Sequence, residues 1–132
     1  MSGFDGGSTI APLRGLRVLV VEDGMMVAML MEDLLEEFGC KIVGPAASVD
    51  KALALIATEA IDGAMLDLNL NGHDAYPVAD ELARRGLPFI FVTGYGDQEL
   101  RGGYNNRPRL PKPFRRPDLE RIMTETFTSI SE

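Results

Sequence analysis

The sequence predicts an α/β fold in which five parallel strands form one doubly wound sheet. Short apolar runs, among them "LRVLVV" and "PFIFVTG", alternate with longer stretches of helical spacing, which is typical of strands joined by crossover helices. Parallel strands are covered on both faces, and these runs are accordingly apolar. A chain of 132 residues with 45% hydrophobic residues suits one domain around a single core.

Each predicted strand is a short apolar run that ends at a charged, polar or glycine residue. The first run ends at Glu22 and Asp23, and the third carries Asp67 near its end. The fourth ends at Thr93 and is followed by Gly94. We expect strands at residues 16–21, 40–46, 62–68 and 88–94, with a short fifth strand near Leu110.

The first helix is predicted over residues 25–38, because apolar residues recur there at helical spacing and Gly39 follows. Met25 and Met29 fall on the face opposite Leu34, where solvent is expected. The apolar stripe that should face the sheet consists of Val27, Leu30, Met31, Leu34, Leu35 and Phe38.

Capping and helix-breaking residues mark the other helices. Ser48 is a suitable N-cap for the second helix. The third helix has Pro77 near its first turn and Gly86 after its end. The last helix follows Pro117 and is expected over about residues 118–130.

Two segments lack regular periodicity. The first dozen residues are rich in Gly and Ser, so we expect a flexible leader over residues 1–14 and one domain over residues 15–132. The fourth crossover, "GYGDQELRGGYNNRPRL", contains four glycines and one proline, which predicts a shortened or irregular fourth helix. We expect residues 94–107 to be the most mobile part of the domain.

Composition excludes several classes of protein. The net charge of −7, without a run of Lys or Arg, argues against a nucleic-acid binder. The single cysteine, Cys40, excludes an internal disulfide bond. No apolar run approaches the roughly 20 residues of a membrane span, and no secretory signal opens the chain, so we expect a cytoplasmic protein that does not bind membranes.

Polar residues at the carboxyl ends of the predicted strands can be collected into one site, because ligands of open parallel sheets bind there. Glu22 and Asp23 follow the first strand, and Asp67 ends the third. Three converging carboxylates repel one another unless a cation joins them. An oxygen-rich cluster without a second His or a thiolate favours Mg²⁺ over Zn²⁺ or copper.

Asp67 is also the candidate nucleophile of this site. A carboxylate at the end of an apolar strand can attack phosphorus and form an acyl phosphate. Thr93 and Lys112, at the ends of the fourth and fifth strands, can stabilise the transferring phosphoryl group by a hydrogen bond and by charge. Asn69 can direct its backbone carbonyl to the metal and its side chain to an attacking water, and Gly94 leaves room for a bulky donor.

Together these motifs resemble a known family. The order E-D, D-x-N-L-x-G, a Thr and K-P-F is similar to the receiver domain of bacterial two-component response regulators, and the resemblance covers about residues 16–130. "FVTGYG" with "RPRLPKPF" further resembles the single-domain subgroup known by its FATGY-like motif, which works in stress-response phosphorelays. The resemblance implies a flavodoxin-like sheet of order 2-1-3-4-5.

The resemblance also implies a function. A histidine kinase or a histidine phosphotransfer protein would transfer a phosphoryl group to Asp67, with Mg²⁺ on Glu22, Asp23, Asp67 and the Asn69 carbonyl. Such a protein is not an enzyme beyond its own phosphorylation and dephosphorylation, and it signals by contact with other proteins. We expect a monomer, with a dimer as the open alternative.

The sequence departs from the family pattern at two positions. Most receivers place an aromatic residue three positions before the lysine, where this chain has Arg109. The usual switch between threonine and aromatic ring is therefore in question, and Tyr95 or Tyr104 are the candidates to replace it. Glu22 stands where Asp is commoner, which predicts a changed metal geometry.

Three other functions remain as alternatives. A degenerate receiver would act as a binding scaffold without phosphorylation. A Mg²⁺-dependent phosphatase would carry its nucleophilic Asp after the first strand, where "EDGMM" lacks the second acid two residues on. An FMN-binding protein would need a loop rich in Ser, Thr and Gly where Glu22 and Asp23 stand. We interpret His73 as a loop residue without a catalytic role.

Overall fold

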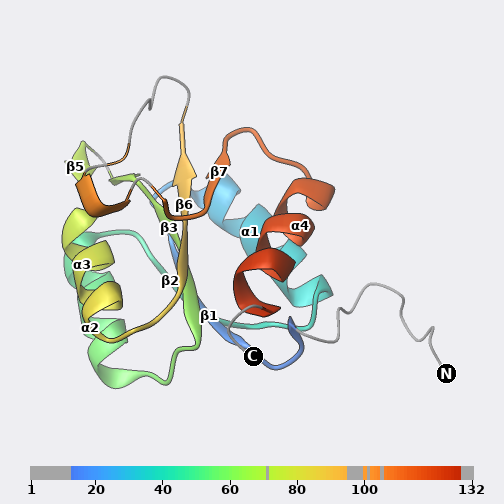
Figure 1. Ribbon diagram of the computed structural model, residues 1–132, viewed down its shortest axis with the longest axis horizontal. Helices are drawn as coiled ribbons and strands as arrows, with labels where there is room; N and C mark the ends of the chain where they lie inside the picture. The colour runs from blue at the N-terminus through green and yellow to red at the C-terminus, as the bar shows by residue number, and fades with distance from the viewer. Residues whose placement is uncertain (1–12, 71, 95–99, 101, 105, 129–132) are drawn as a thin grey trace, which may run out of the picture.

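The computed structural model describes residues 13–70, 72–94, 100, 102–104 and 106–128. Its main feature is a five-stranded sheet in the order β2-β1-β3-β6-β7, in which every neighbouring pair is parallel (Figure 1). This is the predicted order 2-1-3-4-5, because β4 and β5 form a separate hairpin. The strands are β1 (Arg17–Val21), β2 (Lys41–Ala46), β3 (Gly63–Asp67), β6 (Phe89–Thr93) and β7 (Arg109–Pro111).

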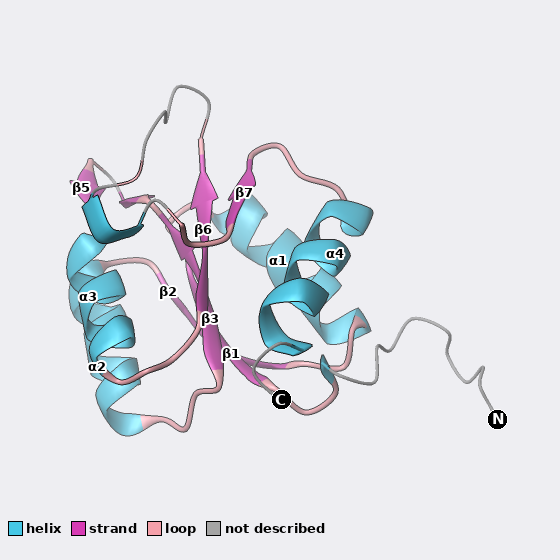
Figure 2. Cartoon of the chain, viewed as in Figure 1, coloured by secondary structure: helices cyan, strands magenta, loops and turns pink. Residues whose placement is uncertain are grey.

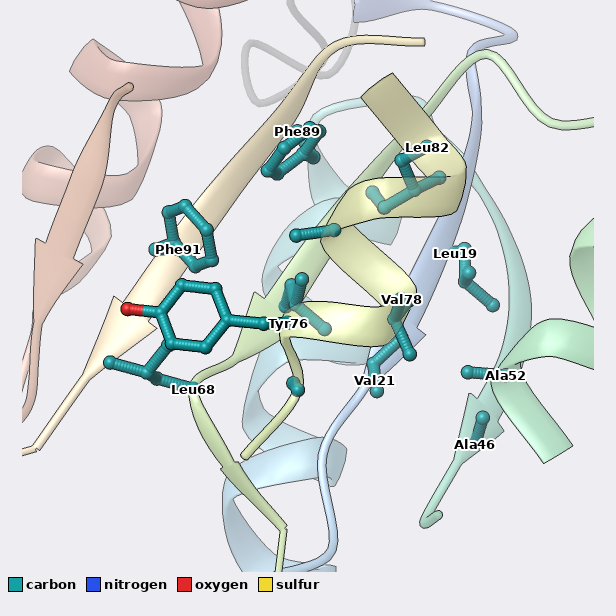
Figure 3. Close-up of a cluster of buried hydrophobic side chains, with 14 of the residues drawn as sticks. Leu19, Val21, Ala46, Ala52, Leu68, Tyr76, Val78, Leu82, Phe89 and Phe91 are labelled. Atoms are coloured by element: carbon teal, nitrogen blue, oxygen red, sulfur yellow. The ribbon is translucent and has the colours of Figure 1, made fainter. Parts of the chain in front are cut away.

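Helices cover both faces of the sheet, as a doubly wound fold requires (Figure 2). The first pair, α1 (Met25–Glu37) and α4 (Arg116–Thr128), packs on one face, and α2 (Val49–Thr58) and α3 (Tyr76–Arg84) pack on the other. The apolar side chains accordingly form two clusters, one under each pair of helices. Figure 3 shows the cluster under α2 and α3, where Phe91 of β6 lies beside Tyr76.

The predicted helix boundaries are confirmed where the sequence carried a capping residue. The Ser48 hydroxyl accepts a hydrogen bond from the Lys51 N–H at 3.2 Å, which caps α2. Gly39 follows α1 with a φ of 99°, a left-handed conformation that favours glycine. Pro77 lies in the first turn of α3, as expected. The last helix begins at Arg116, two residues earlier than predicted.

The outer face of α1 is more apolar than predicted. Leu30 was expected in the buried stripe, and this is wrong, because its side chain is exposed. The buried residues of α1 are Ala28, Met31, Leu34 and Leu35. Ala28 of the first turn is buried and Val27 packs against the cluster under α1 and α4, so Leu30 lies outside the face of the helix that packs on the sheet.

Two connections have a local structure that periodicity does not reveal. After β3 the chain forms a small antiparallel hairpin of β4 (Asn69–Leu70) and β5 (His73–Asp74). In the described part of the fourth crossover, the helical element is the 3₁₀ turn η2 (Gly102–Tyr104), and Leu100 is buried before it. The irregular fourth helix is thus confirmed for these residues. Tyr95 and half of the expected mobile segment lie outside the described residues.

The amino-terminal boundary can be placed from Leu13. Residues 1–12 of the expected leader lie outside the described residues, but Leu13 is fully buried in the cluster under α1 and α4. The folded part therefore begins no later than Leu13. Cys40 belongs to the same cluster, and burial raises the pKa of its thiol to about 11. Within the described residues, none of the helices combines the length and the hydropathy that crossing a membrane requires.

Candidate functional site

The predicted site residues meet at the carboxyl ends of the strands. Glu22 and Asp23 follow β1, Asp67 ends β3, Thr93 ends β6 and Lys112 follows β7. One carboxylate oxygen each from Glu22, Asp23 and Asp67 lie within 4.8 Å of one another. The parallel register brings these residues together, because Val21 is paired with Leu66 and Asp67 with Val92. The convergence expected from the sequence is therefore present.

Glu22 is a buried acid of the site, with 3% of its surface exposed. Its Oε2 accepts a hydrogen bond from the Gly24 N–H at 2.9 Å. Its Oε1 is buried and has no hydrogen-bond partner among the described residues, although the Lys112 ammonium lies 3.4 Å away. Burial raises the pKa of Glu22, and the neighbouring charge of Asp67 adds to this, while Gly24 and Lys112 oppose it. A charged Glu22 therefore costs folding free energy at neutral pH.

Asp67 is also 3% exposed, and its two oxygens have different partners. Oδ1 accepts a hydrogen bond from the Asn69 N–H at 3.1 Å. Oδ2 accepts one from the Lys112 ammonium at 3.3 Å. The next residue, Leu68, donates its N–H to the Val92 carbonyl at 3.1 Å, which fixes the end of β3 beside the end of β6. The carboxylate is thus held in place at the floor of the site.

Lys112 is the cation of the site. Its ammonium lies between Glu22 and Asp67, and the backbone N–H of Lys112 donates a hydrogen bond to the Thr93 carbonyl at 2.7 Å. Burial lowers the pKa of Lys112, but the charges of Asp67 and Glu22 outweigh this and raise it. Lys112 therefore remains charged and joins the ends of β1, β3 and β6.

The side chain of Asn69 contacts the turn that follows it, and its expected role toward an attacking water stays a prediction. Its Oδ1 accepts a hydrogen bond from the Gly72 N–H at 2.9 Å, which ties the carboxamide oxygen to the turn between β4 and β5. The backbone N–H of Asn69 contributes to the site through its bond to Asp67. His73 is exposed on β5, outside the group of carboxylates. The role of the Asn69 carbonyl as a metal ligand stays a prediction.

The charges of the site fit a hard divalent cation. Three carboxylates face one ammonium group, and no residue in the described part of the chain hydrogen-bonds to the buried Glu22 Oε1. Carboxylate oxygens are the ligands that Mg²⁺ prefers, and the group contains no imidazole or thiolate that would favour Zn²⁺ or copper. The residues present thus fit a hard divalent cation such as Mg²⁺, and Glu22, Asp23 and Asp67 could hold it.

Replacing Asp23 by Asn tests this arrangement. In EDTA the variant should melt about 2–6 °C above the wild type, because loss of one charge relieves the repulsion among the three acids by about 1 kcal/mol. The wild type should gain stability on adding MgCl₂, since a ligand of the folded state stabilises it, and the variant should gain little. Thermal unfolding in EDTA and in MgCl₂ measures both effects.

Asp33→Asn is the matched control, because it makes the same chemical change at an exposed position of α1. It should keep the response of the wild type to MgCl₂. An Asp23→Asn protein whose melting temperature responds to MgCl₂ as the wild type does would remove Asp23 from the metal site.

Comparisons with known proteins agree with this geometry. The family model of the response regulator receiver domain matches residues 18–123. The solution structure of SdrG from Sphingomonas melonis Fr1 is 38% identical, with a TM-score of 0.76 over 83% of this chain and 94% of that chain. The crystal structure of the response regulator PhyR from Brucella abortus is 25% identical, with a TM-score of 0.79 over 91% of this chain and 51% of that chain.

A PhyR protein is also similar to this chain in sequence. The phyllosphere-induced regulator PhyR of Methylorubrum extorquens is 28% identical over 93% of this chain and 48% of its own length. The chain spans about half the length of the curated relatives it matches. The likeness to SdrG and PhyR supports the stress-response subgroup that the motif around Thr93 indicated.

Proposed function

The chain belongs to the response regulator receiver domain family of two-component systems, and on this basis we propose that it accepts a phosphoryl group on Asp67 from a phosphohistidine of a histidine kinase or a histidine phosphotransfer protein. The observation that carries the proposal is the setting of Asp67. Its carboxylate is held by the Asn69 N–H and the Lys112 ammonium, and it lies beside the strand that ends at Thr93.

The proposed reaction is a transfer between two side chains. An oxygen of Asp67 attacks phosphorus and forms a P–O bond, while the P–N bond of the phosphohistidine breaks. The electron pair of that bond stays on the imidazole nitrogen of the donor. The Lys112 ammonium offsets negative charge on the phosphoryl oxygens, and the Thr93 hydroxyl donates a hydrogen bond to one of them.

Mg²⁺ would be held by Glu22, Asp23, Asp67 and the Asn69 carbonyl. When bound, it supplies positive charge that offsets the charge of the phosphoryl oxygens. Gly24 supports this site through its N–H bond to Glu22. A Cβ at Gly24 would lie 3.1 Å from Glu22 Oε2, so a larger residue there would displace the carboxylate.

A surface next to the site suits contact with the donor protein. The apolar collar consists of four exposed side chains on α1, which are Met25 (75%), Met26 (83%), Met29 (56%) and Leu30 (44%). The helix begins directly after Glu22, Asp23 and Gly24, so the collar adjoins the acidic site. Flexible thioethers adapt to the shape of a partner surface. We assign the collar to docking of the protein that carries the phosphohistidine.

A comparison of two phosphoryl donors tests whether the apolar collar is a docking surface. The double substitution Met26→Ser and Met29→Ser should slow labelling by a phosphorylated kinase at least about tenfold, since loss of two buried contacts weakens docking by more than 1.4 kcal/mol. Labelling by acetyl phosphate, which needs no docking, should stay unchanged. Both side chains are exposed, so the fold should lose little stability.

Transfer of ³²P from a panel of phosphorylated histidine kinases and phosphotransfer proteins provides the measurement. Glu36→Ser, an exposed change on the same helix, serves as the control and should leave both donors unaffected. Equal rates from the kinase for the variant and the wild type would remove the collar from docking. An equal loss with acetyl phosphate would indicate damage to the site instead.

A second candidate function follows from Arg109. This residue lies on β7, where most receivers carry the aromatic ring of their switch. A scaffold that binds partners without phosphorylation would need no such ring. The Asp67→Asn variant separates the two functions, because a scaffold would bind its partner equally well with and without the carboxylate.

A further inference from the structure

In the β6–β7 crossover, Tyr104 covers β6 in the way that a helix side chain would. The other described crossovers of the sheet each contribute an α-helix, whereas the described part of the β6–β7 crossover contributes the three-residue turn η2. Figure 1 shows η2 beside α3, on the α2/α3 side of the sheet. Tyr104, at the end of η2, packs against the cluster that contains Phe89 and Phe91.

The ring of Tyr104 contacts three other aromatic rings. It stacks on Tyr76 of α3 with centroids 5.9 Å apart and an interplanar angle of 20°. It also meets Phe89 and Phe91 of β6 edge to face, at 5.9 and 5.7 Å. These are favourable geometries, each worth about 0.5–1.5 kcal/mol beyond buried area. Figure 3 shows the three partner rings, with Tyr76 and Phe91 beside Leu68.

Polar groups hold the ring from its outer side. The Tyr104 hydroxyl donates a hydrogen bond to Asp80 Oδ1 of α3 at 2.6 Å. The Arg107 guanidinium lies over the Phe89 ring at 4.7 Å and over Tyr104 at 5.9 Å. Asp80 is exposed, so its bond to Tyr104 can open without leaving a buried charge. We call this arrangement of Tyr104 and Asp80 the clasp.

The clasp and the acceptor site share strand β6. Phe89, Phe91 and Thr93 are alternate residues of this strand, so their side chains leave it on the same face. Leu68, which follows Asp67, packs in the same cluster as Phe91. A change in the position of Thr93 is therefore passed to rings that touch Tyr104.

We propose that the clasp is the conformational element that reads the phosphorylation of Asp67, closed before phosphorylation and open after it. The proposal rests on the proposed function. A phosphoryl group would draw Thr93 and Gly94 toward Asp67, and close-packed rings cannot follow such a shift while keeping every contact. Tyr104 thereby takes the role of the aromatic switch residue, whose usual position is occupied by Arg109 in this chain. By linkage, opening the clasp favours the phosphorylated state.

Fluorine NMR can follow the clasp directly. The chain has three tyrosines, so protein labelled with 3-fluorotyrosine gives three resonances, and Tyr104→Phe identifies one of them. Phosphorylation with acetyl phosphate and Mg²⁺ should shift the Tyr104 resonance in the wild type. Asp67→Asn protein, treated in the same way, should show no shift.

Variants test the hydrogen bond. Tyr104→Phe keeps the ring and removes its hydroxyl, and Asp80→Ala removes the acceptor. Each should tighten binding of beryllofluoride, a phosphoryl analogue, about fivefold or more. The double variant should match either single variant, because both break the same bond. Asp33→Ala, an exposed control on α1, should bind as the wild type does.

The outcomes separate the clasp from the function on which it rests. If Asp67 becomes labelled and the Tyr104 resonance stays in place, the proposal for the clasp is overturned, whereas the proposal that Asp67 accepts the phosphoryl group is supported. If Asp67 does not become labelled, both are overturned. Additive effects of Tyr104→Phe and Asp80→Ala, or binding equal to that of Asp33→Ala, would likewise overturn the clasp.

Discussion

Replacing Asp67 by Asn should abolish Mg²⁺-dependent labelling by acetyl phosphate or by a phosphorylated kinase. The amide has nearly the shape of the carboxylate but is not a nucleophile, so no acyl phosphate can form. The fold should not suffer, because the substitution removes one of three clustered negative charges. Incorporation of ³²P into purified protein, together with its melting temperature, measures both expectations.

Two nearby residues provide controls for this substitution. Asp74 and His73 are exposed on β5, at the end of the hairpin that follows Asp67. Asp74→Asn and His73→Gln should keep the labelling of the wild type. Full labelling of the Asp67→Asn protein would move the acceptor elsewhere, and loss of labelling in one of the control variants would show where.

Replacing Gly63 by Ala should strongly destabilise the fold. Gly63 begins β3, and a Cβ at this position would collide with the ring of Phe127 on α4 and approach the Pro88 carbonyl at 3.1 Å. Overpacking of this kind costs about 2–3 kcal/mol, which lowers the melting temperature by roughly 6–15 °C. Thermal unfolding measures the loss, and labelling at low temperature should persist because Asp67 lies at the other end of β3.

A double-mutant cycle separates the collision from other effects. Phe127→Leu should remove the ring atoms that the new Cβ meets, so Gly63→Ala should cost much less in that background. Gly103→Ala is the matched control, since a Cβ there has open space around it. Equal costs of Gly63→Ala with and without Phe127 would contradict the collision.

The sheet and its helices could be predicted because they depend on local patterns. Apolar runs and helical spacing determine which segments cross the core. Ser48 caps the start of α2, and Gly39 follows the end of α1 in a left-handed conformation. The site followed from the same reasoning, since the carboxyl ends of parallel strands meet at one edge. Glu22, Asp67 and Lys112 are adjacent for this reason alone.

The features that could not be predicted depend on tertiary contacts. Leu30 fits the apolar stripe of α1 by spacing, but it lies outside the face of the helix that packs on the sheet. The Asn69 side chain turns to Gly72 because a hairpin forms there, and two-residue strands leave no periodic signal. The place of Tyr104 depends on Tyr76 and Asp80, which are more than twenty residues away.

The two outer strands bear on how the protein avoids aggregation. An open sheet exposes unpaired backbone groups at both edges, and such edges recruit further strands. Here β2 contains Pro45 and β7 contains Pro111, and proline has no N–H to offer an incoming chain. Lys41 and Arg109 add charge to the same strands. Both edges of the sheet therefore resist the addition of a further strand.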